Sequence, residues 1–184
     1  MGKFKILKGF HISHILPKFY KDKPLLNFDF SFTSNCLYDV GEIHNQDVNK
    51  LFGLSFGFIH NTTIWGKLLS KKANSFRLGW NCSAQNRKIQ LYAYYYNDGV
   101  RKIEYIADID LNRVYNSYIY FDRTANKIVV DISSADSLIS TFSSQTVYDF
   151  RFKNCPRYGY YLFPYFGGTL SAPHNLLMYI NLLS

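Results

Sequence analysis

The chain has 184 residues, 47% of them hydrophobic and 18% charged, which is enough apolar side chain for one domain and little length for two. Its aromatic content of 16 Tyr, 16 Phe and 2 Trp favours pleated sheet over helix. The three cysteines form no C-x-x-C pair, which excludes a zinc ribbon and a CxxC redox motif.

The first 24 residues form a basic segment that we expect to be an arm outside the folded domain. Six lysines and one aspartate place +5 of the net charge of +8 in the first 25 residues. These lysines are Lys3, Lys5, Lys8, Lys18, Lys21 and Lys23. Such a field attracts nucleic acid, an anionic membrane or an acidic protein, and a solvated tail is the plain alternative. Residues 9–20 lack an uninterrupted apolar run, so we expect neither a cleaved signal nor a membrane span.

From Leu25 onward, alternating apolar and polar residues predict one strand after another. Residues 27–33 place Phe28, Phe30 and Phe32 on one face, which is the period of two of a half-buried strand. The same pattern recurs at residues 51–58, 76–80 and 89–95.

Asn97-Asp98-Gly99 predicts a type I′ hairpin between residues 88–96 and 100–108, because Asp-Gly readily adopts positive φ angles. Further strands are expected at 117–121, 127–132, 158–163 and 176–182, and short helical turns at 45–52 and 134–142. About nine or ten strands at this spacing predict an all-β antiparallel sandwich over residues 25–184, of jelly-roll or concanavalin-like type.

Catalytic and metal-binding patterns are weak. The chain has two Glu, Glu42 and Glu104, far apart, and the best carboxylate pair is Asp108 with Asp110, which we interpret as solvated charges at a strand end. His11 and His14 could meet on one helical turn, which we interpret as a surface pair, whereas the other three histidines have no Cys or carboxylate at ligand spacing. There is no nucleophile elbow and no phosphate-binding glycine loop. We therefore expect no enzyme activity, no metal and no cofactor.

The run Tyr92 to Tyr96 is the strongest candidate for a ligand surface. Arg87, Lys88, Arg101 and Lys102 flank it, and rings beside cations suit a sugar or single-stranded nucleic acid. Alternation puts Tyr92, Tyr94 and Tyr96 on one face, so the other face is expected to be core. A carbohydrate-binding module would expose Trp65, Trp80 or this run.

Two stretches carry a resemblance to a protein group. They are Asp47 to Gly53 leading to Phe76 to Trp80 and Ile89 to Tyr94, and Pro164 to Gly168 leading to Ala172 to His174. Together they resemble uncharacterised concanavalin-like or jelly-roll β-sandwich proteins of Bacteroidota and their tailed phages, crAss-like phages among them. The resemblance implies a sandwich associated with a virion or a surface, and transfers no catalytic residue.

These observations lead to two functional hypotheses. The first is a structural virion protein that docks through its basic arm, with Tyr165 and His174 at a further contact in the loop between Pro164 and Pro173. Its partners would be other virion or surface-assembly proteins, including copies of itself, and its location the virion rather than the bacterial cytoplasm or cell surface. The alternative is a carbohydrate-binding module with an aromatic platform; nucleic acid binding through the arm also stays open.

Overall fold

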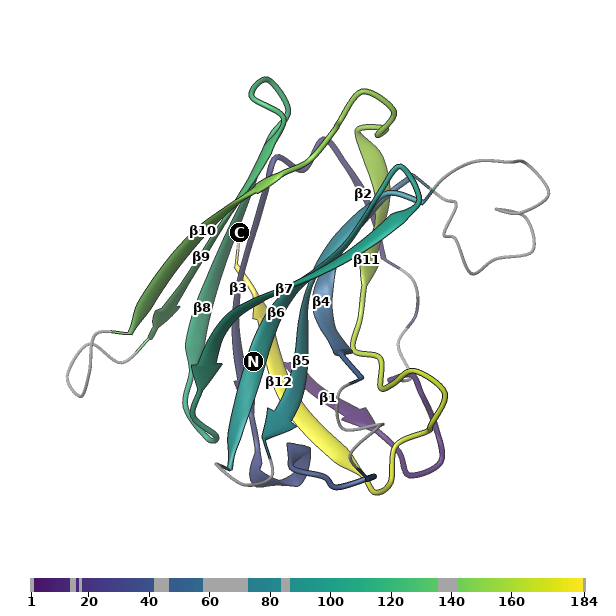
Figure 1. Cartoon of the computed structure of the whole chain (residues 1–184), viewed down its shortest axis with the longest axis vertical. Helices are drawn as coiled ribbons and strands as arrows, with labels where there is room; N and C mark the ends of the chain where they lie inside the picture. Colours follow the sequence, from purple (N-terminus) through teal and green to yellow (C-terminus); the bar gives the residue numbers. More distant parts are fainter. Residues whose placement is uncertain are drawn as a thin grey trace.

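The computed structural model describes residues 2–13, 16, 18–41, 47–57, 73–83, 87–135 and 142–183. These residues form two antiparallel sheets packed face to face, as Figure 1 shows, with six strands in each sheet. Sheet A has the order β1 (Gly2–Ile6), β12 (Leu176–Leu182), β3 (Leu25–Phe32), β8 (Tyr115–Asp122), β9 (Lys127–Ser134) and β10 (Ser143–Asp149). Sheet B has the order β2 (Phe19–Lys21), β11 (Tyr158–Leu162), β4 (Asn49–Phe56), β5 (Ser75–Ser83), β6 (Lys88–Asn97) and β7 (Val100–Ile109). The predicted β-sandwich is confirmed.

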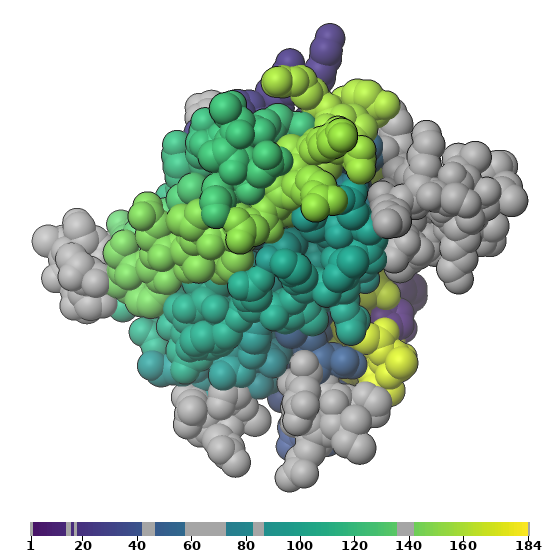
Figure 2. Space-filling model, turned by 45° about the horizontal axis from the view of Figure 1, so that its top comes forward, coloured from purple at the N-terminus to yellow at the C-terminus, as the bar shows by residue number. Residues whose placement is uncertain are grey.

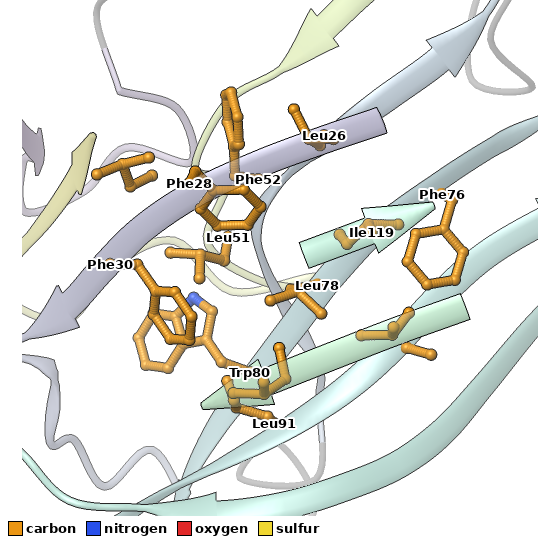
Figure 3. Packing of buried hydrophobic residues seen from close by; sticks show 14 of the residues in the cluster. Leu26, Phe28, Phe30, Leu51, Phe52, Phe76, Leu78, Trp80, Leu91 and Ile119 are labelled. Atoms are coloured by element: carbon orange, nitrogen blue, oxygen red, sulfur yellow. The ribbon is translucent and has the colours of Figure 1, made fainter. Parts of the chain in front are cut away.

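The core lies between the sheets and follows the predicted alternation. Phe28, Phe30 and Phe32 of β3 are fully buried. Figure 3 shows Phe28 and Phe30 beside apolar side chains from the strands of sheet B. Trp80 of β5 is also fully buried, with its ring centroid 5.0 Å from that of Phe32. Aromatic rings from the two layers thus contact one another within the core.

The hairpin at Asp98-Gly99 forms as predicted. It joins β6 to β7 directly, and Asp98 and Gly99 have φ angles of 50° and 81°, the two positive values that a type I′ turn requires. Asn74 reinforces the turn, because its side-chain oxygen accepts a hydrogen bond from the Asp98 amide at 2.7 Å.

The first 24 residues contribute a strand to each sheet, whereas their sequence predicts an arm outside the sandwich. β1 pairs with β12, and β2 pairs with β11. Ile6 of β1 is fully buried, and the Phe4 ring stacks 5.9 Å from that of Phe163. The basic segment therefore forms one side of the sandwich.

Other differences from the predicted elements concern polar strands and short helices. The described residues form twelve strands. The strands not predicted are β1, discussed above, and the edge strands β2 and β10, which bury too few side chains to produce an apolar pattern. Residues 49–52 belong to β4 and not to a helical turn, and residues 45–46 and 136–141 lie outside the described part of the chain.

The side of the sandwich opposite β1 and β2 is closed where β10 lies next to β7, as the space-filling view shows (Figure 2). Tyr148 of β10 meets Tyr95 of β6 there, with ring centroids 5.8 Å apart. Within the described ranges, no helix has the length and apolar character needed to span a membrane.

Candidate binding face on sheet B

The face of sheet B that points away from the core carries an ordered array of tyrosines around small residues and two cations. Strand register places its side chains in rows that cross the sheet. The rows are Tyr160, Ser55, Ser75, Tyr96 and Arg101; Leu162, Gly53, Arg77, Tyr94 and Ile103; and Lys50, Gly79, Tyr92 and Tyr105, with Tyr165 bridged to Lys50.

Side-chain size changes systematically along these rows. The middle strands β4 and β5 supply Gly53, Ser55, Ser75 and Gly79, whereas tyrosines stand on β11 and β6, about 14 Å apart across three strand spacings. All four small residues are buried, and Lys50 and Arg77 of the same two strands lie among them. We call Lys50, Arg77, Tyr94, Tyr96, Tyr160 and Tyr165 the tyrosine–cation cluster.

Both cations of the cluster contact the Tyr94 ring. The Lys50 ammonium lies 4.8 Å from its centroid and the Arg77 guanidinium 5.4 Å from it. Lys50 Nζ also lies 5.4 Å from the Tyr165 centroid and donates a hydrogen bond to the Gly167 carbonyl oxygen at 2.8 Å. These cation–π contacts hold the two positive charges close together on the face.

Burial disfavours both charges. It lowers the pKa of Lys50 to about 8, with the like charge of Arg77 acting in the same direction. Burial also lowers the pKa of Arg77, while the nearby Tyr94, Tyr160 and Tyr96 hydroxyls oppose that shift. Arg77 and Tyr94 are only 7% and 5% exposed, so the accessible part of the cluster is Lys50, Tyr96, Tyr160 and Tyr165, each half-buried.

The predicted division of the tyrosine run is confirmed. Tyr92, Tyr94 and Tyr96 lie on the outer face, and Tyr95 packs in the core with its ring 5.7 Å from that of Phe76. Trp80 is a core residue and not part of a platform. Trp65 lies outside the described residues. Among the flanking cations, Arg101 shares the outer face, whereas Lys102 lies over Tyr95 on the opposite face, 5.8 Å from its ring.

Lys50 and Arg77 are the members of the cluster that sequence reasoning missed. Lys50 fell within a segment predicted to be helical. Arg77 lies between Phe76 and Leu78 in the sequence, and this alternation predicts that it is on the outer face. Alternation within one strand does not reveal that Arg77 is buried on that face.

The loop predicted as a contact places Tyr165 and His174 in different surroundings. Tyr165 stacks on His11, with ring centroids 5.5 Å apart, and joins the tyrosine–cation cluster. The Nε2 atom of His174 lies 2.9 Å from the Asn35 carbonyl oxygen, at the exposed end of sheet A. No contact between the two is recorded among the described residues.

The six predicted partner-binding lysines are spread along the side formed by β1, β2 and their connection. Lys3, Lys5, Lys8, Lys18 and Lys21 are exposed, and Lys23 is half-buried beside a cavity of about 260 Å³ lined also by Asp22, Pro24, Arg123 and Arg157. Exposed apolar side chains accompany them. We call the surface of these six lysines with Phe10, Ile12, Leu16 and Phe19 the basic edge.

The carboxylate pair behaves as interpreted from the sequence, as charges at a strand end. Asp108 accepts a hydrogen bond from the Tyr105 hydroxyl at 3.0 Å. Asp110 is 54% exposed and forms ion pairs with Lys88 and Arg113 at 3.8 and 3.7 Å. Within the described residues, no group of three His, Cys, Asp or Glu side chains is arranged to hold a metal.

No family model matches the chain, and no curated protein does. Among solved structures, it is similar to a bifunctional GH43-CE protein of Bacteroides eggerthii, with a TM-score of 0.47 and 13% identity over 96% of this chain and 20% of that one. It is also similar to Scytalido-glutamic peptidase bound to a peptide-based transition-state analogue, with a TM-score of 0.32 and 7% identity over 96% of this chain and 65% of that one. The chain spans a fifth of the first protein's length. At these scores the likenesses carry no information on ligand or activity.

Proposed function

We propose that this chain is a binding domain that holds a carbohydrate on the outer face of sheet B. The observation that carries the proposal is the register of β11, β4, β5 and β6, which places Tyr160 and Tyr96 at opposite ends of one row, with the buried Ser55 and Ser75 between them. Sugar rings present flat C–H faces and many hydroxyls, so they pair well with tyrosine rings and with the tyrosine hydroxyls. The half-buried Tyr96 and Tyr160 are the accessible rings of this arrangement.

Retention on immobilised neutral and acidic polysaccharides tests this proposal. We expect Tyr96→Ala and Tyr160→Ala each to weaken retention at least about tenfold, because each removes one stacking ring. Tyr118→Ala is the matched control, since Tyr118 is 42% exposed on the outer face of sheet A. Equal retention of all three variants and the unchanged chain, or no retention on any polysaccharide, would contradict a carbohydrate site here.

We propose a binding role and not catalysis because Asp108 and Asp110, the best carboxylate pair, both interact with other side chains. Asp108 is held by Tyr105, and Asp110 is paired with Lys88 and Arg113 at the end of β7. Neither carboxylate belongs to the tyrosine–cation cluster.

A second candidate function is a structural virion component that docks through the basic edge onto neighbouring subunits or an acidic surface. The observation in its favour is the mixture of lysines with exposed apolar groups there, with Leu16 85% and Phe19 63% exposed. Charged groups steer an encounter and apolar groups stabilise the resulting contact, so this composition suits a protein interface. The resemblance to proteins of Bacteroidota phages is consistent with this role.

Light scattering tests docking between copies of the chain. We expect a mass above the 21.5 kDa monomer at low salt, which falls toward the monomer at about 0.5 M salt. Replacing Lys3, Lys5 and Lys21 with Gln should abolish the association, whereas replacing Lys88, Lys102 and Lys153 should not. A monomer under all conditions would exclude self-assembly through this edge.

A further inference from the structure

β7 is the longest strand at the edge of either sheet. It ends sheet B and pairs on one side with β6, and no described strand pairs with its other side. The other edge strands, β1, β2 and β10, have five, three and seven residues, whereas β7 has ten. An edge strand of this length presents a row of backbone N–H and C=O groups that can pair with another chain.

The first part of β7 is open on the side away from β6. Residues 100–105 are all exposed. The two-residue turn at Asp98-Gly99 makes its flanking residues a hydrogen-bonded pair, and hydrogen-bonded and non-hydrogen-bonded pairs then alternate along the hairpin. Arg101, Ile103 and Tyr105 consequently turn their backbone N–H and C=O groups away from β6. Within the described residues, no backbone hydrogen bond joins these three to a segment other than β6.

The charges on this part of β7 make the strand complementary to itself. Lys102 and Glu104 lie two residues apart on one face, and both are exposed. Glu104 accepts a hydrogen bond from the Tyr95 hydroxyl, but neither charge takes part in an ion pair formed within the described residues. In an antiparallel pair of two β7 strands centred on Ile103, Lys102 of each copy lies opposite Glu104 of the other.

Charge selects this register over its neighbours. Centring the pair on residue 102 would place Lys102 opposite Lys102 of the other copy. Centring it on residue 104 would place Glu104 opposite Glu104. Like charges directly opposite each other destabilise a pair of strands, whereas opposite charges stabilise it.

We propose that two copies of the chain associate through β7, in the antiparallel register centred on Ile103, so that their two sheets B continue into one sheet. The Ile103 side chains, each 40% exposed in the single chain, then lie opposite each other. Arg101 of each copy lies opposite Tyr105 of the other, whose ring is 54% exposed and can accept a cation. The pairing uses no part of the tyrosine–cation cluster, so it does not depend on the ligand of that face.

The contact is small, and the dimer is therefore weak. Three residues of each copy supply about six backbone hydrogen bonds in this register. An interface of this size lies well below the roughly 1,000 Å² of a stable complex, and we expect a dissociation constant of about 10 to 100 µM. At about 5 µM this contact is dissociated, so it can be measured apart from association through the basic edge, on the opposite side of the sandwich.

Sedimentation velocity between about 5 and 500 µM tests the proposal. We expect the mass to rise from 21.5 kDa toward twice that value. Ile103→Pro should keep the chain monomeric at about 500 µM, because proline removes an outward N–H group and leaves the bonds to β6 intact. A mass that does not change with concentration overturns the dimer and leaves the proposed binding face on sheet B unaffected.

Val147→Pro is the matched control, because Val147 is an exposed residue of the other long edge strand, β10, and its N–H group also points away from the paired strand. It should leave the dimer unchanged. Both proline variants should unfold as cooperatively as the unchanged chain. Loss of the dimer in Val147→Pro would overturn pairing through β7.

Charge reversal tests the register without proline. Lys102→Glu and Glu104→Lys should each weaken the dimer at least about tenfold, because each places like charges opposite one another twice per dimer. The double variant Lys102→Glu with Glu104→Lys restores both opposite-charge pairs, so its affinity should return to within about threefold of the unchanged chain. Unchanged affinity in the single variants, or no recovery in the double variant, overturns the proposed register.

Discussion

Lys50 carries a positive charge whose burial lowers the stability of the folded chain. Burial and the neighbouring Arg77 disfavour its charge, so its pKa falls from 10.5 to about 8. The unfolded chain therefore holds this proton more tightly than the folded chain does. The resulting penalty on folding is complete below about pH 8 and disappears as the pH rises toward 10.5.

Replacing Lys50 with Met should accordingly stabilise the protein. We expect the free energy of unfolding to rise by about 1 to 3 kcal/mol at pH 7, because an apolar side chain avoids the cost of the buried charge. The advantage should shrink above about pH 8, as the unchanged chain loses the proton. Urea denaturation at several pH values measures it; a less stable variant at neutral pH would show that the cation–π contacts outweigh burial.

Gly159 is a second residue with a specific physical role. A Cβ atom at this position in β11 would collide with the Ser55 carbonyl oxygen of β4. We expect Gly159→Ala to lower the free energy of unfolding by about 1 to 3 kcal/mol, because the strands would have to separate. Gly2→Ala, near the chain terminus, is the control and should change it by less than about 0.5 kcal/mol. Equal effects in thermal denaturation would disprove the close-packing argument.

At the scale of elements, β1 combines an exposed basic face with a buried apolar one. Lys3 and Lys5 are exposed, whereas Phe4 and Ile6 pack toward the core. The same strand can therefore carry charge for a partner and close the edge of sheet A. Deleting it removes both properties at once, so a truncation cannot separate docking from folding.

Removing residues 1–7 should destabilise the chain by at least about 3 kcal/mol, because it strips Ile6 and Phe4 from the core and uncovers the edge of β12. The double variant Lys3→Gln and Lys5→Gln keeps the strand, and should stay within about 0.5 kcal/mol of the unchanged chain. Guanidinium unfolding compares them. A truncated chain as stable as the full one would show that β1 is dispensable.

At the scale of the whole molecule, the two ends of the chain depend on each other. β12 lies between β1 and β3, and its Leu176, Met178 and Ile180 are buried. A chain that stops after residue 175 would leave β1 without a partner and open the core beside β3. We expect it to show no cooperative thermal transition by circular dichroism; a sharp transition would mean that the remaining strands form a stable core on their own.

The three cysteines should report on the integrity of the whole fold. All are free and buried, and burial raises the pKa of Cys36 and of Cys155 to about 12. Because the thiolate is the reactive form, we expect a thiol reagent at about pH 8 to modify the native chain slowly and the unfolded chain at once. Absorbance kinetics measure this. Immediate modification of one thiol in the native chain would identify a local opening.

The sequence by itself determined the strands whose side chains alternate between core and solvent. Burial of Phe28, Phe30 and Phe32 requires a period of two, so β3 could be predicted from that pattern alone. The Asp98-Gly99 turn was predictable for a similar reason, because it depends on local φ angles. Both features depend on residues that are adjacent in the sequence, so a short stretch of sequence is enough to predict them.

Only the tertiary structure decided which strands are neighbours, and with it the candidate site. Lys50, Arg77, Tyr94 and Tyr160 come from four strands, and pairing alone brings them onto one face. The same holds for β1, whose partner β12 is at the other end of the chain. Strand pairing is made by backbone hydrogen bonds that every residue type except proline can form, so the side-chain sequence of one strand does not specify its partner.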